Sequence, residues 1–207
     1  MKEYTECARE MLEFIDKSPT CVQAVKNIGD MLSAAGLAEL READEWKLER
    51  GKGYFVTRNE SSVIAFRIPE QLSGFHIAAA HSDSPSFKVK ESPESTVEEH
   101  YVRLNTEKYG GMILSTWLDR ALSVAGRIAV NGEKGIETRL VNVDKDLLVI
   151  PNVAIHMNRD MNNGVAYNPQ VDMLPLFADC SGGEKRSLMS CVAEAAGVNE
   201  EDIMGHD

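Results

Sequence analysis

The chain has 207 residues, of which 43% are hydrophobic and 27% charged, as is usual for a globular protein with one large core or two small ones. A net charge of −11 argues against nucleic-acid binding, which requires clustered Lys and Arg. We find no apolar run of about 18 residues and no signal-peptide pattern at the charged N-terminus, so we expect a cytoplasmic protein without a membrane partner. The four cysteines form no Cys-x-x-Cys pair, which indicates reduced thiols and gives no support to a cysteine zinc site.

The first third of the chain predicts two helices and a hairpin. Apolar residues at helical spacing predict a helix over residues 4–16 and another after Ser18, which we expect to be its N-cap, with Gly36 ending it. Two β-rich runs, residues 54–57 and 63–68, flank a turn-like segment and predict a hairpin.

A polar cluster follows the next apolar run. Residues 77–80 lie between Gly and Pro punctuation and predict a buried strand, which ends at His81 and Asp83. In extended backbone, residues two apart point to the same side, so an imidazole and a carboxylate would emerge together. That pair suits a metal ligand with an orienting carboxylate. A histidine at a strand end beside an ordinary Asp-Ser-Pro turn is an equally open interpretation.

The remainder of the chain predicts mainly strands. Residues 91–99, rich in Ser, Pro and Glu, indicate a domain boundary or a mobile loop. A helix is predicted over residues 188–196, and close strand spacing predicts a compact, mostly antiparallel second domain. The predicted strands cover residues 101–104, 111–117, 122–130, 136–143 and 147–150.

Three further residues have competing interpretations. His156 lies in an apolar context beside a polar loop, where a hydrogen-bonded core histidine is the simplest assignment. Asp119 and Arg120 most simply form an ion pair, with burial a further option. The residues alone therefore indicate an α/β protein, with a metal-linked strand end as one option.

Five separated blocks, in matching order and spacing, resemble one family, the aspartyl aminopeptidases, which are zinc enzymes. The resemblance spans essentially the whole chain, and blocks in register are far more specific than any single one. The blocks are FIDKSPT at 14–20, YFVTRN with SVIAF at 54–66, AHSDSP at 80–85, YGG with TWLDRALSVAGR at 109–127, and IPNVAIHMNR at 150–159, followed by Asn168 and LP at 174–175.

The resemblance implies an α/β fold in two parts. Residues 1–91 would be the first part of a zinc-peptidase-like α/β catalytic domain. Residues 92–207 would be most or all of an inserted β-rich dimerisation domain. Members of the family assemble as homo-oligomers, from dimers into a tetrahedral dodecamer that encloses the active sites.

The resemblance also implies roles for three residues. His81 matches the first zinc ligand of a two-zinc site, and Asp83 matches the catalytic-site aspartate beside it. His156 matches a dimerisation-domain histidine that reaches the neighbouring subunit's active site and helps to hold the peptide substrate. The bridging aspartate, the general-base glutamate and the remaining ligands lie, in the family, beyond the point where this chain ends.

The resulting interpretation is a metalloaminopeptidase that removes N-terminal residues, acidic ones in many family members, from peptides. We expect this chain to be the first part of a longer protein and to be inactive alone, since it offers one convincing ligand where a dinuclear site needs several. Two alternatives stay open. One is a non-catalytic oligomerisation or binding module, and the other is an unrelated α/β hydrolase that uses His81 and Asp83 without metal.

Overall fold

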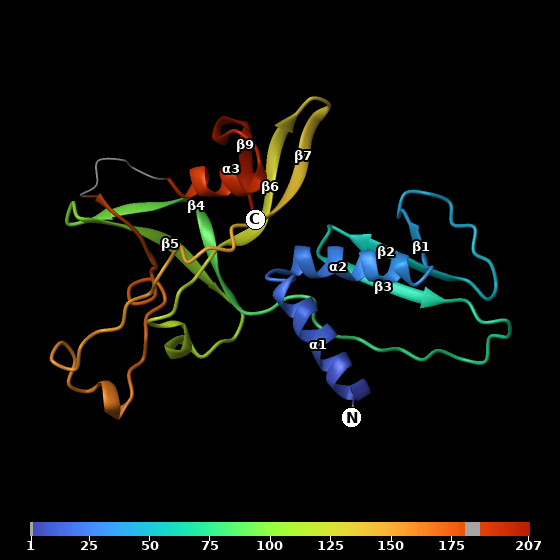
Figure 1. Ribbon diagram of the computed structural model, residues 1–207, viewed down its shortest axis with the longest axis horizontal. Coiled ribbons are helices and arrows are strands. Elements are labelled where there is room, and N and C mark those ends of the chain that lie inside the picture. The colour runs from blue at the N-terminus through green and yellow to red at the C-terminus, as the bar shows by residue number, and fades with distance from the viewer. Residues whose placement is uncertain (1, 181–186) are drawn as a thin grey trace. The chain divides into compact units, whose positions relative to one another are not determined.

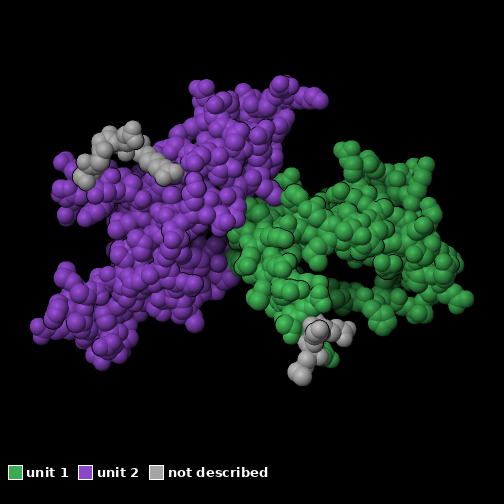
Figure 2. All heavy atoms as spheres, in the orientation of Figure 1, with its two compact units in different colours: residues 1–84 green, residues 85–207 purple. Residues whose placement is uncertain are grey.

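The computed structural model describes residues 2–180 and 187–207 and shows two compact units, residues 1–84 and 85–207 (Figure 2). Helices and strands occur in both units, so the α/β class predicted from the sequence is confirmed. Among the described residues, no helix has the length and apolar character needed to cross a membrane.

The first unit packs a helix on a three-stranded sheet (Figure 1). The strands lie in the order β1-β2-β3, with β1 parallel and β3 antiparallel to β2. Helix α2 packs closely on β2 at Gly29. A side-chain Cβ at this position would lie 3.5 Å from the ring of Phe55, which is buried (1% exposed). The elements are α1 (Lys2–Asp16), α2 (Cys21–Ala34), β1 (Ala38–Leu40), β2 (Gly53–Arg58) and β3 (Ser62–Arg67).

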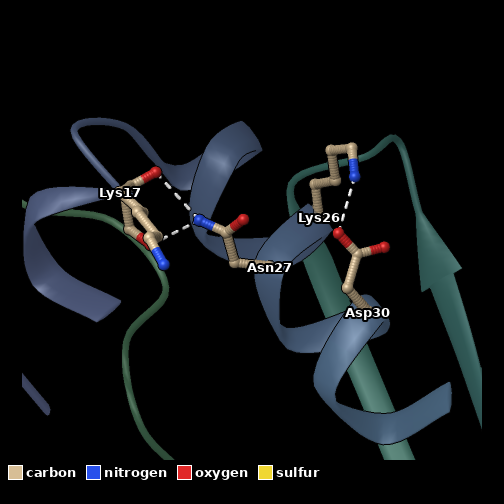
Figure 3. A network of polar contacts seen from close by, with 5 residues as sticks. Lys17, Lys26, Asn27 and Asp30 are labelled. Carbon is tan, nitrogen blue, oxygen red and sulfur yellow. Dashed lines mark hydrogen bonds and ion pairs between the residues drawn. The ribbon is translucent and has the colours of Figure 1, made fainter. Parts of the chain in front are cut away.

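The joint between α1 and α2 corrects one prediction (Figure 3). Ser18 is not the N-cap of α2, which begins at Cys21 with Thr20 in the cap position. The reason is that Asn27 folds back, donating from Nδ2 to the backbone oxygen of Lys17 at 2.8 Å and to Ser18 Oγ at 3.0 Å. Ser18 is therefore used as an acceptor that ties α2 to the end of α1. Figure 3 also shows the ion pair that spans one turn of α2 on its exposed side.

The end of α2 agrees with the sequence pattern, but the apolar face of α1 is not buried as its spacing would suggest. Gly36 follows the C-cap of α2 with φ +81°, as expected of a helix-ending glycine. The apolar positions of α1 do not enter a core, because Met11, Leu12 and Ile15 are all more than half exposed.

The second unit contains two three-stranded sheets and a helix. The sheet orders are β4-β5-β8 and β7-β6-β9, and every pairing between these strands is antiparallel, as the strand spacing predicted. Helix α3 packs its buried side chains against β6 and β7. The bounds are β4 (Ser86–Val97), β5 (Tyr101–Tyr109), β6 (Ala125–Gly132), β7 (Gly135–Asn142), β8 (Leu176–Asp179), α3 (Leu188–Ala196) and β9 (Ile203–His206), with short 3₁₀ turns at Leu114–Trp117, Met161–Asn163 and Glu200–Asp202.

The predicted break at residues 91–99 is wrong, because β4 runs through most of it. The strand tolerates this polar sequence because, among the described residues, it is an edge strand paired with β5 alone, and the register shift between Val89 and Glu94 accommodates Pro93. One polar residue has a structural task. The Glu94 carboxylate accepts the backbone N–H of Leu188 at 2.7 Å, at the start of α3.

Two further strand predictions, for residues 111–117 and 147–150, are wrong. Part of residues 111–117 forms a 3₁₀ turn, in which Thr116 Oγ1 donates to the backbone oxygen of Ile113 at 2.7 Å. Residues 147–150 form isolated bridges rather than a strand. They still close a small second core, in which Ile150 and Met173 are fully buried beside Leu118.

Candidate metal and substrate site

The segment that carries His81 and Asp83 is not the buried strand that we predicted. Residues 77–80 have no regular secondary structure, and Ile77 is 86% exposed. A strand interior is stable only when neighbouring strands take up its backbone hydrogen bonds, and no strand among the described residues pairs with this run. The apolar composition of residues 77–80 predicts burial, but no surface in the described part of the chain covers them.

One hydrogen bond fixes the polar end of this segment to the first unit. Ser82 Oγ donates to the backbone oxygen of Ser61 at 2.9 Å, in the turn between β2 and β3. The chain is thus held at the residue between His81 and Asp83, although the run before it is exposed.

His81 and Asp83 do point to the same side, as their spacing predicted. His81 Nδ1 lies 3.0 Å from Asp83 Oδ1. An ionised carboxylate only accepts, so Nδ1 carries the proton in this contact, and in the neutral ring Nε2 keeps its lone pair. The His81 side chain is 92% exposed and Asp83 is 37% exposed, so Nε2 is accessible.

This arrangement fits one part of a zinc site. A histidine that ligates zinc through one nitrogen commonly donates its other N–H to a carboxylate, which fixes the tautomer and the ring orientation. The described residues bring no three His, Cys, Asp or Glu side chains together in a metal-binding group. The pair is therefore a partial ligand set, and a closed structural zinc site, which takes four ligands, is not built from it.

His156 lies in the second unit, in an exposed turn. The backbone N–H of Met157 donates to the oxygen of Ala154 at 2.8 Å and closes this turn. The flanking Ile155 and Met157 are 45% and 78% exposed. The core histidine that the apolar context predicted is therefore not present, because His156 and its apolar neighbours are exposed.

Sequence reasoning missed the residue that anchors this loop. Asp119 has φ +56°, and its Oδ1 accepts the backbone N–H of Asn152 at 2.9 Å, while its own N–H donates to the oxygen of buried Ile150 at 2.9 Å. The expected ion pair with Arg120 is not among the salt bridges of the described residues, and both side chains are exposed. An aspartate at a loop base was detectable only as a residue type that tolerates positive φ.

A family model described as "Aminopeptidase I zinc metalloprotease (M18)" matches residues 14–207. The chain belongs to this family. A "Probable M18 family aminopeptidase 2" of Clostridium novyi (strain NT) is 43% identical over 214 residues, which cover 100% of this chain. The chain spans 49% of that relative's length, that is, about half of an M18 protein.

Several solved structures share the fold of this chain. The chain in "Cryo-EM structure of the Ape4 and Nbr1 complex" superposes with a TM-score of 0.91 at 34% identity, over 98% of this chain and 43% of that chain. "Structure of Chaetomium thermophilum mApe1" gives 0.84 at 28% identity, over 96% and 48%. "Structure of S. cerevesiae mApe1 dodecamer" gives 0.74 at 22% identity, over 98% and 47%, a likeness of fold alone. The family resemblance drawn from the five sequence blocks is confirmed.

Proposed function

We propose that this chain supplies the first part of the active site of a zinc aminopeptidase, with His81 as a metal ligand and Asp83 as the carboxylate that orients it. The observation that carries the proposal is the 3.0 Å contact between His81 Nδ1 and Asp83 Oδ1 on an exposed imidazole, in a member of a zinc metalloprotease family. Zinc, when bound, would polarise the scissile carbonyl of the peptide and lower the pKa of the attacking water.

The role of this chain's own residues follows from that contact. Asp83 holds the proton on Nδ1 and the ring in one orientation, so Nε2 is presented as a neutral donor. We propose a two-zinc site in the complete enzyme, whose remaining ligands lie outside the described residues. Because those residues offer a pair of candidate ligands and not a larger group, we expect the 207-residue chain alone to have no peptidase activity.

The proposal for the second unit is self-association. We propose that the second unit, which includes residues 92–207, acts as the dimerisation domain and that His156 crosses to the partner subunit, where it binds the peptide substrate. Support comes from the exposed turn that presents His156 and from a related fold solved as a dodecamer.

The four cysteines are free thiols, as a reducing compartment maintains them, which supports the proposed cytoplasmic location.

Metal content tests the first role separately from activity. In the full-length protein, meaning this chain with any sequence that naturally continues it, H81A should lower bound zinc and abolish hydrolysis of aminoacyl substrates. D83N should retain part of the zinc but lower kcat, because the amide no longer fixes the Nδ1 proton in the same way. Full zinc and full activity in H81A would refute the proposal.

Mixed oligomers test the second role. H81A and H156A chains, each inactive or weak alone, are combined by reversible dissociation. If His156 acts across the dimer, one site in each mixed dimer pairs an intact His81 with an intact partner His156. Random mixing makes half of the dimers mixed, so activity should recover to about a quarter of the unaltered value. Action within one subunit predicts no recovery, and that result would reject the crossing role.

The alternative, a non-catalytic oligomerisation module, is favoured by one observation: the described residues lack a complete metal-binding group. Metal-free, inactive full-length protein that still assembles would select it.

A further inference from the structure

The β6–β7 hairpin leaves one long, regular strand edge open. Strand β7 has eight residues and is an edge strand in the order β7-β6-β9 among the described residues (Figure 1). The other edge strands of this unit are less suited to pairing, because β8 and β9 have four residues each and β4 is interrupted by a register shift.

The hairpin register determines which backbone groups point outward. Gly132 pairs with Gly135 across a two-residue turn, and such a closing pair exchanges both of its backbone hydrogen bonds. The bonding then alternates along the strands. Residues 135, 137, 139 and 141 direct their backbone groups toward β6, so Ile136, Thr138 and Leu140 direct theirs to the open edge.

The sequence of this edge is self-complementary when it runs antiparallel to a copy of itself. With Thr138 opposite the partner's Thr138, Ile136 lies opposite the partner's Leu140, and all these residues have outward-pointing backbone groups. The same register places Glu137 opposite the partner's Arg139 on both sides of the two-fold axis. Ile136 is 73% exposed, so this pairing would also bury an apolar side chain that is now in solvent.

Charge selects this register over its neighbours. A shift in one direction that keeps outward-pointing groups paired places Glu137 opposite the partner's Glu137. The shift in the other direction places Arg139 opposite the partner's Arg139. Like charges directly opposite one another destabilise an antiparallel pair. Within one chain, Glu137 and Arg139 are only loosely paired, with 3.9 Å between Oε2 and Nη2, and both are nearly half exposed.

We propose that β7 pairs with β7 of a second copy of this chain, joining two three-stranded sheets into one six-stranded sheet across a two-fold axis. This inference specifies the self-association in the proposed function but does not depend on peptidase chemistry.

Charge exchange tests the register. Sedimentation equilibrium at low salt is run on the 207-residue chain and on the full-length protein, with circular dichroism to verify folding. E137R and R139E should each raise the dimer dissociation constant at least tenfold, and the double exchange E137R/R139E should return it to within threefold of the unaltered value. E133R, which makes the same charge change in the turn, is the matched control and should stay within threefold.

Cysteine cross-linking tests the central pair independently. In an antiparallel hydrogen-bonded pair the Cα atoms lie about 5.5 Å apart, within the range that a disulfide spans. T138C should therefore form a disulfide-linked dimer on mild oxidation, whereas I136C, which faces Leu140 of the partner, should not. Both variants keep the same native cysteines, so the difference reports position.

The results separate this inference from the proposed function. A monomeric chain, unchanged dissociation in E137R, or equal cross-linking of I136C and T138C would overturn β7 pairing even in an active, oligomeric enzyme. Loss of zinc or activity in the full-length protein would instead bear on the metal site and leave the pairing result standing.

Discussion

Asp119 offers the sharpest test of how the second unit presents His156. Its carboxylate accepts the Asn152 N–H at 2.9 Å, and its backbone adopts φ +56°. The D119A variant removes the acceptor, which costs about 1 kcal/mol, and places a Cβ without a local polar partner in the left-handed region, which costs about 1 kcal/mol more. We therefore expect D119A to destabilise the unit by about 2 kcal/mol.

Two matched variants separate these contributions. D119N keeps a side-chain acceptor and a residue type that tolerates positive φ, so it should cost less than about 0.5 kcal/mol. D119G removes the acceptor but relieves the backbone penalty, so it should fall between the other two, near 1 kcal/mol. The expected order of destabilisation is D119N, D119G, D119A.

Urea unfolding and amide exchange measure the two effects. The protein has two tryptophans, one in each unit, so a Trp46→Phe background leaves Trp117 as the reporter of the second unit. Exchange at the Asn152 amide should accelerate in D119A and D119G but not in D119N. Equal stability of D119A and D119N, or an Asn152 amide indifferent to all three changes, would refute this account of the loop.

Two further predictions concern the stability of the same unit. Ile150 is fully buried with Leu118 and Met173, so I150A should cost about 2–5 kcal/mol and I150V about 0.5–1.5 kcal/mol in urea unfolding, whereas equal effects would mean that the small core is not closed. The pKa of Asp207 is lowered mainly by the hydrogen bond from Lys88 and less by that from Arg127. The contribution of Asp207 to the free energy of unfolding is therefore present above the unfolded pKa of about 3.9 and is lost as pH falls through the lower folded pKa. The Asp207 side chain is half exposed, so D207N should cost no more than about 1 kcal/mol at pH 7, and its difference from the unaltered chain should vanish in acid; a pH-independent difference in the unfolding free energy would contradict the pairing.

Local patterns predicted the elements that are stabilised locally. The helix ending at Gly36 and the hairpin turns carry their own signals in spacing and turn residues, and the structure contains them. The run at residues 77–80 failed for the opposite reason. Its composition indicates burial, but burial depends on a partner surface that composition does not specify.

The candidate site was predictable in part. The spacing of His81 and Asp83 placed their side chains together, and the structure confirms the contact. Their catalytic and metal roles, and the role of His156, came from the family resemblance and stay predictions. Asp119 was missed because its task depends on a backbone contact with Asn152, 33 residues away, which no local pattern encodes.

The exposed apolar stripe of α1 has a consequence for the life of the chain in the cell. During synthesis α1 is made before the strands of its own unit, and Met11, Leu12 and Ile15 remain more than half exposed even after that unit has folded. Chaperones that bind exposed apolar segments would therefore meet this helix on the nascent chain.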